Sequence, residues 1–273
     1  RVPENQPFYM DGGSVVFFEQ SPFTKKNYWQ MRNNENSSCA VRHQGETVFR
    51  EVDQPFFGLH RTRRTGARTF DVWSMRKKKY QIGETVALSM NNCRETAGAF
   101  FSESSDLAVA QVTVNYLHGF GWLTQMCRDV SFTGVHFHPD SQHHVSSFAD
   151  CIHVCGCKGT VTIKDCSFTQ AHDDAINIHG AFLRFVRRVD DHTAVFQFVH
   201  RQQGGYRAFF PGDTVRFYYR SSLQPCGEEN TVAAAEDDID AKTCTLTFDR
   251  PLPENIDAKF RGCLLYTSPS PRD

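Results

Sequence analysis

Two short segments repeat one frame 24 residues apart, and this repeat constrains the fold more than any other feature of the chain. Asp150-x-Ile152-x-Val154 returns as Asp174-x-Ile176-x-Ile178. Apolar residues at alternating positions predict strands, because successive side chains point to opposite faces. A period of this length is typical of solenoids, in which each coil buries its apolar face against the next. We therefore expect the two segments to be strands of successive coils.

Other segments support a solenoid of β-strands. Short runs rich in Val, Ile and Phe, each with a polar lead-in and a turn, occur at 104–114, 127–132 and 157–168. Helical periodicity is weak throughout. The sequence therefore predicts an all-β chain, with a parallel β-helix (solenoid) and small antiparallel β-barrel-like insertions.

Changes in this pattern divide the chain into five parts. We expect residues 1–34 to begin the β-helix and residues 91–184 to form the coils with the aspartates. Residues 35–90 and 185–262 alternate between apolar strands and polar turns, which predicts two barrel-like insertions. Residues 263–273 fit no earlier pattern and look like translated adapter sequence, so we expect a non-native tail. The chain begins at Arg1, and we expect it to be a piece of a longer protein.

Composition excludes several function classes. The net charge is −1, so nothing favours nucleic acid or an anionic membrane as partner. No apolar run approaches the roughly 20 residues of a membrane span, and no signal peptide is present. Among the ten cysteines, only Cys155 and Cys157 are close in sequence. This is not the usual spacing of a zinc site, so most cysteines are expected to be small buried residues, with disulfides left open.

The aspartates are the candidate catalytic groups. Stacked strands lie about 4.8 Å apart, so Asp150 and Asp174 should be neighbours, with Asp173 to one side, and His153 should lie above Asn177. Three ionised carboxylates repel one another, so one should hold a proton more readily than the others. An inverting glycosidase needs such a set, with a carboxylic acid for the leaving oxygen and a carboxylate that activates water.

Two other interpretations of the aspartates stay open. Asp-Asp is also a common turn dipeptide, although its recurrence one coil away, beside His153, His172, Asn177 and His179, makes a turn alone less attractive. Aspartate and histidine can bind a metal, but no established ligand spacing is present, and we expect none. The histidines and Asn177 could bind sugar hydroxyls or serve only the structure.

The chain resembles glycoside hydrolase family 110, the α-1,3-galactosidases. The resemblance rests on Arg94, on the Gly119-Phe-Gly121 turn, and above all on the Asp-Asp-Ala-Ile-Asn-Ile-His-Gly run that starts at Asp173, with Asp150 upstream. It covers about 90 residues well and extends more weakly into the Gly212-Asp-Thr-Val segment.

This resemblance implies a right-handed parallel β-helix and an inverting exo-α-1,3-galactosidase without cofactor. It implies Asp173 as general acid and Asp150 with Asp174 as the general base pair. Substrate contacts would fall on His153, Asn177, His179, His172 and Arg94. The substrate would be a glycan with terminal α-1,3-galactose, either blood-group-B-like or linear, and the protein would be secreted, periplasmic or cell-surface. The family continues with further coils, so the present chain is expected to be inactive or poorly stable alone.

Two alternatives remain. Another β-helix glycosidase, of polygalacturonase type, also uses clustered aspartates. A non-catalytic glycan-binding β-helix would keep the fold without turnover. A homo-oligomer stays open, as does the choice between linear and fucosylated substrates.

Overall fold

The computed structural model describes fifteen stretches of the chain, and all are strands, turns or loops. They are residues 9–11, 15–17, 30–31, 37–46, 50–52, 59–67, 69–74, 81–90, 96–117, 119–140, 143, 145–200, 204–254, 256 and 263–267. The chain is therefore all-β over these residues, as predicted. They include no helix that could cross a membrane.

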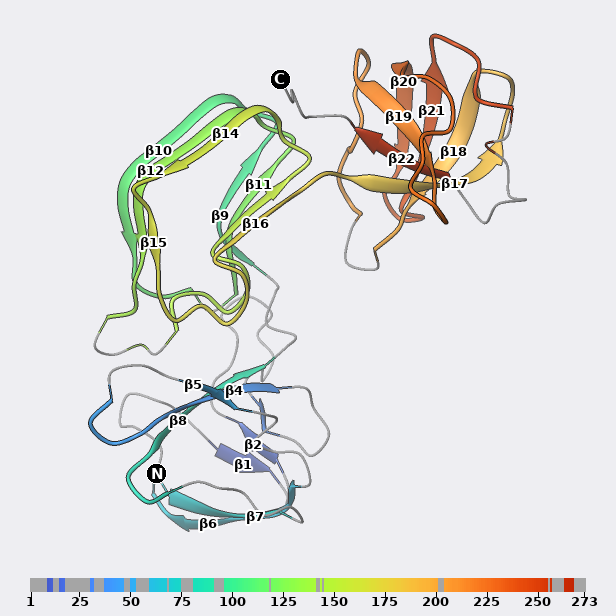
Figure 1. The fold of residues 1–273 in the computed structure, drawn as a ribbon. Coiled ribbons are helices and arrows are strands. Elements are labelled where there is room, and N and C mark those ends of the chain that lie inside the picture. The colour runs from blue at the N-terminus through green and yellow to red at the C-terminus, as the bar shows by residue number, and fades with distance from the viewer. Residues whose placement is uncertain are drawn as a thin grey trace.

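The centre of the molecule consists of two parallel sheets, and the chain passes alternately from one to the other (Figure 1). The first contains β9 (Ala97–Ser102), β11 (Phe120–Gln125), β13 (Ile152–Cys155) and β16 (Ile176–His179). The second contains β10 (Ser105–Val114), β12 (Arg128–Phe137), β14 (Lys158–Lys164) and the short β15 (Ser167–Phe168). Every pairing within these two sheets is parallel.

Apolar residues from both sheets form one core. Trp122 and Ile152 of the first sheet are buried with Phe132 and Phe137 of the second. Trp122 lies edge-on to Phe137, with ring centroids 5.4 Å apart. Such aromatic pairs contribute about 0.5–1.5 kcal/mol beyond the burial of their area. The apolar residues that alternate along the sequence thus form the core between the two sheets.

The corner between the two sheets is built alike in successive passes of the chain. Glu103, Met126 and Gly156 follow β9, β11 and β13, and all have positive φ angles of 49°, 52° and 63°. A left-handed residue bends the backbone sharply and is uncommon outside glycine. Its recurrence at equivalent positions means that each pass turns the same corner, which keeps the strands in register.

The 24-residue repeat was predicted correctly. Ile152 pairs with Ile176 and His153 with Asn177 in the parallel register of β13 and β16. The expected burial was only half right, because Ile152 is fully buried whereas Ile176 and Ile178 are 39% and 54% exposed. The reason is their position, since β16 is the outer strand of its sheet among the described residues.

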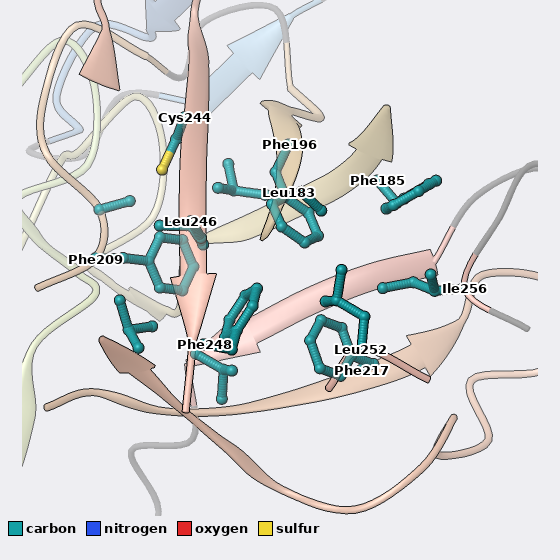
Figure 2. Packing of buried hydrophobic residues seen from close by; sticks show 14 of the residues in the cluster. Leu183, Phe185, Phe196, Phe209, Phe217, Cys244, Leu246, Phe248, Leu252 and Ile256 are labelled. Atoms are coloured by element: carbon teal, nitrogen blue, oxygen red, sulfur yellow. The ribbon is translucent and has the colours of Figure 1, made fainter. Parts of the chain in front are cut away.

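A closed antiparallel barrel follows the parallel sheets, in the order β17-β18-β21-β20-β19-β22. Its strands are β17 (Phe182–Arg188), β18 (Thr193–Phe198), β19 (Thr214–Tyr219), β20 (Asn230–Asp238), β21 (Thr243–Phe248) and β22 (Cys263–Thr267). Phe196, Phe217, Leu246 and Phe248 meet in its interior (Figure 2). Along β21 every second residue is buried, as a small filled barrel requires.

Strand β22 comes from the segment that the sequence analysis set apart as a tail. It pairs with β17 on one side and β19 on the other and so closes the barrel. Backbone hydrogen bonds carry this pairing, and they require an extended chain rather than particular side chains. The origin of residues 263–273 stays a prediction.

The barrel is joined to the parallel sheets by polar contacts. Lys158 at the start of β14 forms an ion pair with Asp213, just before β19. The Sγ atom of Cys155 in β13 lies 3.4 Å from the hydroxyl of Tyr206, which precedes β19. The barrel therefore contacts the sheet that carries the aspartates.

The N-terminal strands pair differently from the central sheets. The strands β1 (Tyr9–Asp11), β2 (Val15–Phe17) and β3 (Gln30–Met31) form an antiparallel sheet. This pairing does not match the expectation that residues 1–34 begin the parallel coils. An antiparallel pair needs only a short turn between strands, whereas a parallel one needs a long crossover.

Within residues 35–90, the structure shows an antiparallel sheet and a hairpin. The sheet has the order β5-β4-β8, and the hairpin joins β6 and β7. The strands are β4 (Ser37–Arg42), β5 (Arg50–Val52), β6 (Leu59–Gly66), β7 (Thr69–Ser74) and β8 (Thr85–Met90). Gly83 before β8 and Gly212 before β19 both have positive φ, 95° and 90°. The segments Gly83-Glu-Thr-Val86 and Gly212-Asp-Thr-Val215 thus form the same turn-to-strand element twice.

The described cysteines fit the expectation of small buried residues. Cys127, Cys151, Cys155, Cys157, Cys166, Cys226 and Cys244 are free thiols, and all but Cys166 are buried.

Candidate active site

The three aspartates converge at the ends of two neighbouring strands. Asp150 lies two residues before β13, and Asp173 and Asp174 lie three and two residues before β16. One carboxylate oxygen from each residue can be chosen so that all three lie within 4.8 Å of one another. The backbone sets this convergence, because the N–H of Cys151 donates to the carbonyl of Asp174 at 2.9 Å. Asp150 is buried, whereas Asp173 and Asp174 are exposed.

Asp150 is held in one orientation by two donors. Its Oδ2 atom accepts hydrogen bonds from His153 Nδ1 at 2.6 Å and from Asn177 Nδ2 at 3.1 Å. Donors aimed at a carboxylate stabilise its ionised form. Asp150 is therefore suited to remain charged and to act as a base or electrostatic stabiliser rather than as a proton donor.

His153 contacts both Asp150 and a second histidine, His179. Its Nε2 atom lies 2.9 Å from Nε2 of His179, whose Nδ1 faces the carbonyl of Gly180 at 2.8 Å. Burial lowers the pKa of His153, but hydrogen bonds with Asp150 and Cys155 raise it more, to about 9. Cys155 likewise raises the pKa of His179 by hydrogen bonding.

Cys155 lies behind this pair, two residues after His153 on the same strand. Burial raises the pKa of its thiol, but hydrogen bonds with the two histidines and Tyr206 lower it more, to about 6. Burial and the neighbouring sulfur also raise the pKa of Tyr206. The barrel thus supplies a hydroxyl to a charged cluster that reaches from Asp150 to Cys155.

Phe120 and Gly121, the first two residues of β11, lie against the same residues. The ring of Phe120 lies edge-on to His153, with centroids 5.3 Å apart. The N–H of Gly121 donates to the carbonyl of Asp150 at 3.0 Å. A Cβ atom at Gly121 would lie 2.1 Å from that carbonyl oxygen. The glycine therefore allows β11 to approach the residue that presents the buried carboxylate.

The predicted site residues fall into three groups. Asp150, Asp173, Asp174, His153, Asn177 and His179 come together as described above. His172 packs against Phe148, with ring centroids 6.0 Å apart. Arg94 lies outside the described residues. Whether these residues contact substrate stays a prediction.

Sequence reasoning missed Phe120, Cys155 and Tyr206. The face alternation of β13 could have indicated Cys155, because it is two residues from His153. No pattern links Tyr206 to the site, since it lies 51 residues away.

The site combines a buried carboxylate that is held ionised with two exposed carboxylates. Such a set can activate water and donate a proton, which is the chemistry of glycoside hydrolysis.

Comparison with known proteins gives a consistent result. Residues 193–259 match the GLAA-B beta-barrel domain II, which corresponds to most of the observed barrel. The chain is 30% identical to alpha-1,3-galactosidase A of Peterkaempfera griseoplana over 278 aligned positions, which cover 93% of the chain and 37% of that relative.

Two further relatives carry related names. Alpha-1,3-galactosidase A of Streptomyces avermitilis is 27% identical over 94% of the chain and 43% of its own length. Alpha-1,3-galactosidase B of Bacteroides fragilis is 35% identical over 52% of the chain and 24% of its own length. The chain thus spans less than half the length of these relatives, although the first two matches cover more than nine-tenths of the chain. These matches support the chain as a part of an α-1,3-galactosidase.

Proposed function

We propose that this site hydrolyses terminal α-1,3-linked galactose from glycans, with inversion at the anomeric carbon and without a cofactor. The observation that carries the proposal is the convergence of Asp150, Asp173 and Asp174 within 4.8 Å. The names of the relatives support galactose as the sugar. Blood-group-B-like and linear α-galactosyl glycans are both candidate substrates.

The hydrogen bonds around the carboxylates support a division of roles. Asp150 accepts from two donors and stays ionised, so it serves as a base together with Asp174. Asp173 is exposed and serves as the general acid. It protonates the oxygen of the leaving sugar, while the two bases orient and deprotonate the attacking water. The glycosidic C–O bond breaks as the bond to water forms, and the products are galactose and the shortened glycan.

The separation of the carboxylates calls for a movement on binding. Inverting enzymes usually keep acid and base about 6.5–9.5 Å apart, and the nearest oxygens here are closer than that. Asp150 is fixed by its two hydrogen bonds, but Asp173 and Asp174 are exposed at the end of a strand. Rotation of their side chains provides the additional space when a sugar and a water enter between them.

We also propose that the two parallel sheets are walls of one right-handed parallel β-helix. The repeated passage of the chain between the two sheets and the recurring left-handed corner residues support this architecture. Parallel crossovers are right-handed in about 98% of cases. In this arrangement the aspartates of residues 91–184 lie on successive coils, and the barrel is an insertion beside them.

The roles can be separated by comparing two substrates of the protein expressed from the complete gene. An α-1,3-galactosyl disaccharide needs a proton donor, whereas 4-nitrophenyl α-galactoside has a leaving group that needs little help. We expect Asp173→Asn to reduce kcat/KM about 10²–10⁴-fold on the disaccharide and far less on the aryl substrate. Asp150→Asn should reduce turnover of both substrates.

Asp71→Asn is the matched control, because Asp71 is an exposed residue of the hairpin that pairs with Arg63. It should leave both rates unchanged. Equal losses on both substrates in Asp173→Asn would refute its role as acid. Turnover of polygalacturonate instead of α-galactosides would refute the proposed substrate, and binding of glycans without any turnover would refute the enzyme.

A divalent cation is the main alternative use of three carboxylates at this spacing. The proposed chemistry does not require one. Dialysis against EDTA should therefore leave turnover unchanged. A loss that Ca²⁺ or Mg²⁺ restores would establish a metal-dependent site.

A further inference from the structure

A continuous hydrogen-bonded chain leads from the buried aspartate to a backbone carbonyl. It runs from Asp150 Oδ2 to His153 Nδ1 at 2.6 Å, and from His153 Nε2 to His179 Nε2 at 2.9 Å. It ends where His179 Nδ1 faces the carbonyl oxygen of Gly180 at 2.8 Å. All four ring nitrogens are engaged with protein atoms.

The partners at the two ends fix the number of protons. A carboxylate and a carbonyl accept hydrogen bonds, so both Nδ1 atoms carry a proton. The central contact joins two nitrogens and needs one proton between them. If both Nε2 atoms carried a proton, the two N–H groups would point at each other, and if neither did, two lone pairs would face each other. The pair therefore holds three protons on four nitrogens, which amounts to one neutral imidazole and one imidazolium.

We propose that His153 and His179 share a single positive charge and act together as the positioning cation of Asp150. The proposal rests on the proposed function in one respect, namely that Asp150 is a catalytic base. The shared cation keeps Asp150 ionised and fixes its Oδ2. His153 and His179 thereby act through Asp150 rather than on the sugar.

The surroundings favour one charge and not two. Each ring taken alone has a raised pKa, but two imidazolium rings cannot meet through their Nε2 atoms at 2.9 Å. The groups that face the pair are Asp150 from the strand entry and Cys155 from β13, and Cys155 in turn contacts Tyr206 of the barrel. Asp173 and Asp174 lie beside Asp150. The cation thus lies between anionic or polarisable partners on both sides.

This arrangement bears on the expectation that these histidines bind sugar hydroxyls. A hydroxyl could bind either ring only by displacing one of these three contacts or a hydrogen bond with Cys155. His153 is also screened, with a side chain 15% exposed. The pair is therefore better placed to tune the base than to recognise the substrate.

The direct test is nitrogen-15 NMR of the histidine rings in the 273-residue chain, which needs no turnover. We expect the His153 and His179 rings to show three protonated nitrogens at pH 7, and the pair to keep its charge at pH 8. Histidine in the chain unfolded in urea should be neutral there, because its ordinary pKa is about 6.5. Two neutral rings at pH 7 would overturn the proposal.

A variant gives the second readout. Glutamine at position 179 can still donate to His153 Nε2 but cannot share a charge. We expect His179→Gln to lower the midpoint at which His153 loses its proton by at least about one pH unit, or roughly tenfold in proton affinity. The matched control is His138→Gln, on the exposed end of the other sheet, where His138 contacts Ser167. It should leave the midpoint of His153 unchanged, and an unchanged midpoint in His179→Gln would also overturn the proposal.

The pH dependence of turnover connects the pair to the base. In the protein from the complete gene, His179→Gln should move the acid limb of kcat/KM on the aryl substrate to higher pH, because Asp150 has lost a neighbouring cation. A lower rate without a shifted limb would indicate a structural role only and overturn the proposal. Absence of galactosidase activity would refute the proposed function, while the ring spectra would still decide whether the pair shares its charge.

Discussion

Replacing Gly121 with alanine should displace the backbone of the buried Asp150. The added Cβ would lie 2.1 Å from the carbonyl oxygen of Asp150 and 2.2 Å from that of Cys151. Ordinary contact begins at 3.4 Å, so the strand entry must move by about 1.3 Å, which is the difference between 3.4 and 2.1. Both obstacles are backbone atoms of the neighbouring strand, so no side-chain rotation relieves the contact.

The expected cost has two parts. Overpacking of this kind typically costs about 1–3 kcal/mol. The displacement also weakens the backbone hydrogen bonds from Gly121 to Asp150 and from Trp122 to Cys151, now 3.0 and 2.8 Å long, which are worth about 1 kcal/mol each. We therefore expect Gly121→Ala to lower the free energy of unfolding by about 2–4 kcal/mol. A displacement near 1 Å at the base should reduce turnover about 100-fold.

Gly98→Ala is the matched control in the adjacent strand of the same sheet. Its Cβ would lie 2.6 Å from the terminal methyl groups of Leu117, which can rotate away for about 0.5–1.5 kcal/mol. Alanine also lowers the conformational entropy of the unfolded chain, which stabilises the folded state by about 0.4–1 kcal/mol. The net change should be below about 1 kcal/mol.

The assay is urea unfolding at pH 7, followed by tryptophan fluorescence, because Trp122 is buried beside Gly121. We expect Gly121→Ala to unfold at clearly lower urea than Gly98→Ala, or not to fold at all. Equal midpoints would refute the reasoning that a close backbone approach behind Asp150 requires the glycine.

Further predictions concern charge, core and interface. Because the pKa of His153 is raised in the folded state, protonation of His153 stabilises the fold fully below the unfolded pKa of 6.5, and this stabilisation is lost as pH rises to about 9. The pKa of Cys155 is lowered, so its ionisation stabilises the fold fully above the unfolded pKa of 9.0, and this stabilisation is lost as pH falls to about 6. Between about pH 6.5 and 9 these two effects oppose each other, so the urea midpoint of the wild type should change little with pH. In Cys155→Ser only the effect of His153 remains, so the urea midpoint should fall as pH rises. A Cys155→Ser midpoint that does not change with pH would contradict this. Phe217→Ala, at a fully buried barrel position, should lower the free energy of unfolding by about 3–5 kcal/mol, and calorimetry that finds less than about 1 kcal/mol would contradict the packing. Lys158→Met should destabilise the chain by about 1–3 kcal/mol because it leaves Asp213 buried without its cation, and a stabilised variant would argue against the ion pair.

Much of the aspartate cluster could be predicted from sequence, because parallel strands stack in register. An offset of 24 residues brings Ile152 to Ile176 and His153 to Asn177, and it brings Asp150 near Asp174 without further information. The contact of His153 with His179 was also within reach. His179 is two residues beyond Asn177, and such diagonal neighbours share one face.

Other features depend on contacts that no local pattern encodes. Cys155 contacts the barrel residue Tyr206, which lies far along the chain and belongs to no repeat. The exposure of Ile176 and Ile178 depends on the position of β16 at the edge of its sheet, which apolar alternation cannot reveal. Periodicity determines which residues share a face, but neighbours outside the repeat determine how that face is covered.

The stereochemistry of the released sugar tests the proposed roles of the three aspartates most directly. Proton NMR of the first galactose released from an α-1,3-galactosyl disaccharide, by the protein from the complete gene, distinguishes the two anomers before they interconvert. We expect β-galactose first, because the water held by Asp150 and Asp174 attacks opposite the leaving oxygen. If α-galactose appears first, the close approach of the carboxylates would indicate a covalent, retaining mechanism, and the proposed roles of the three aspartates would be wrong.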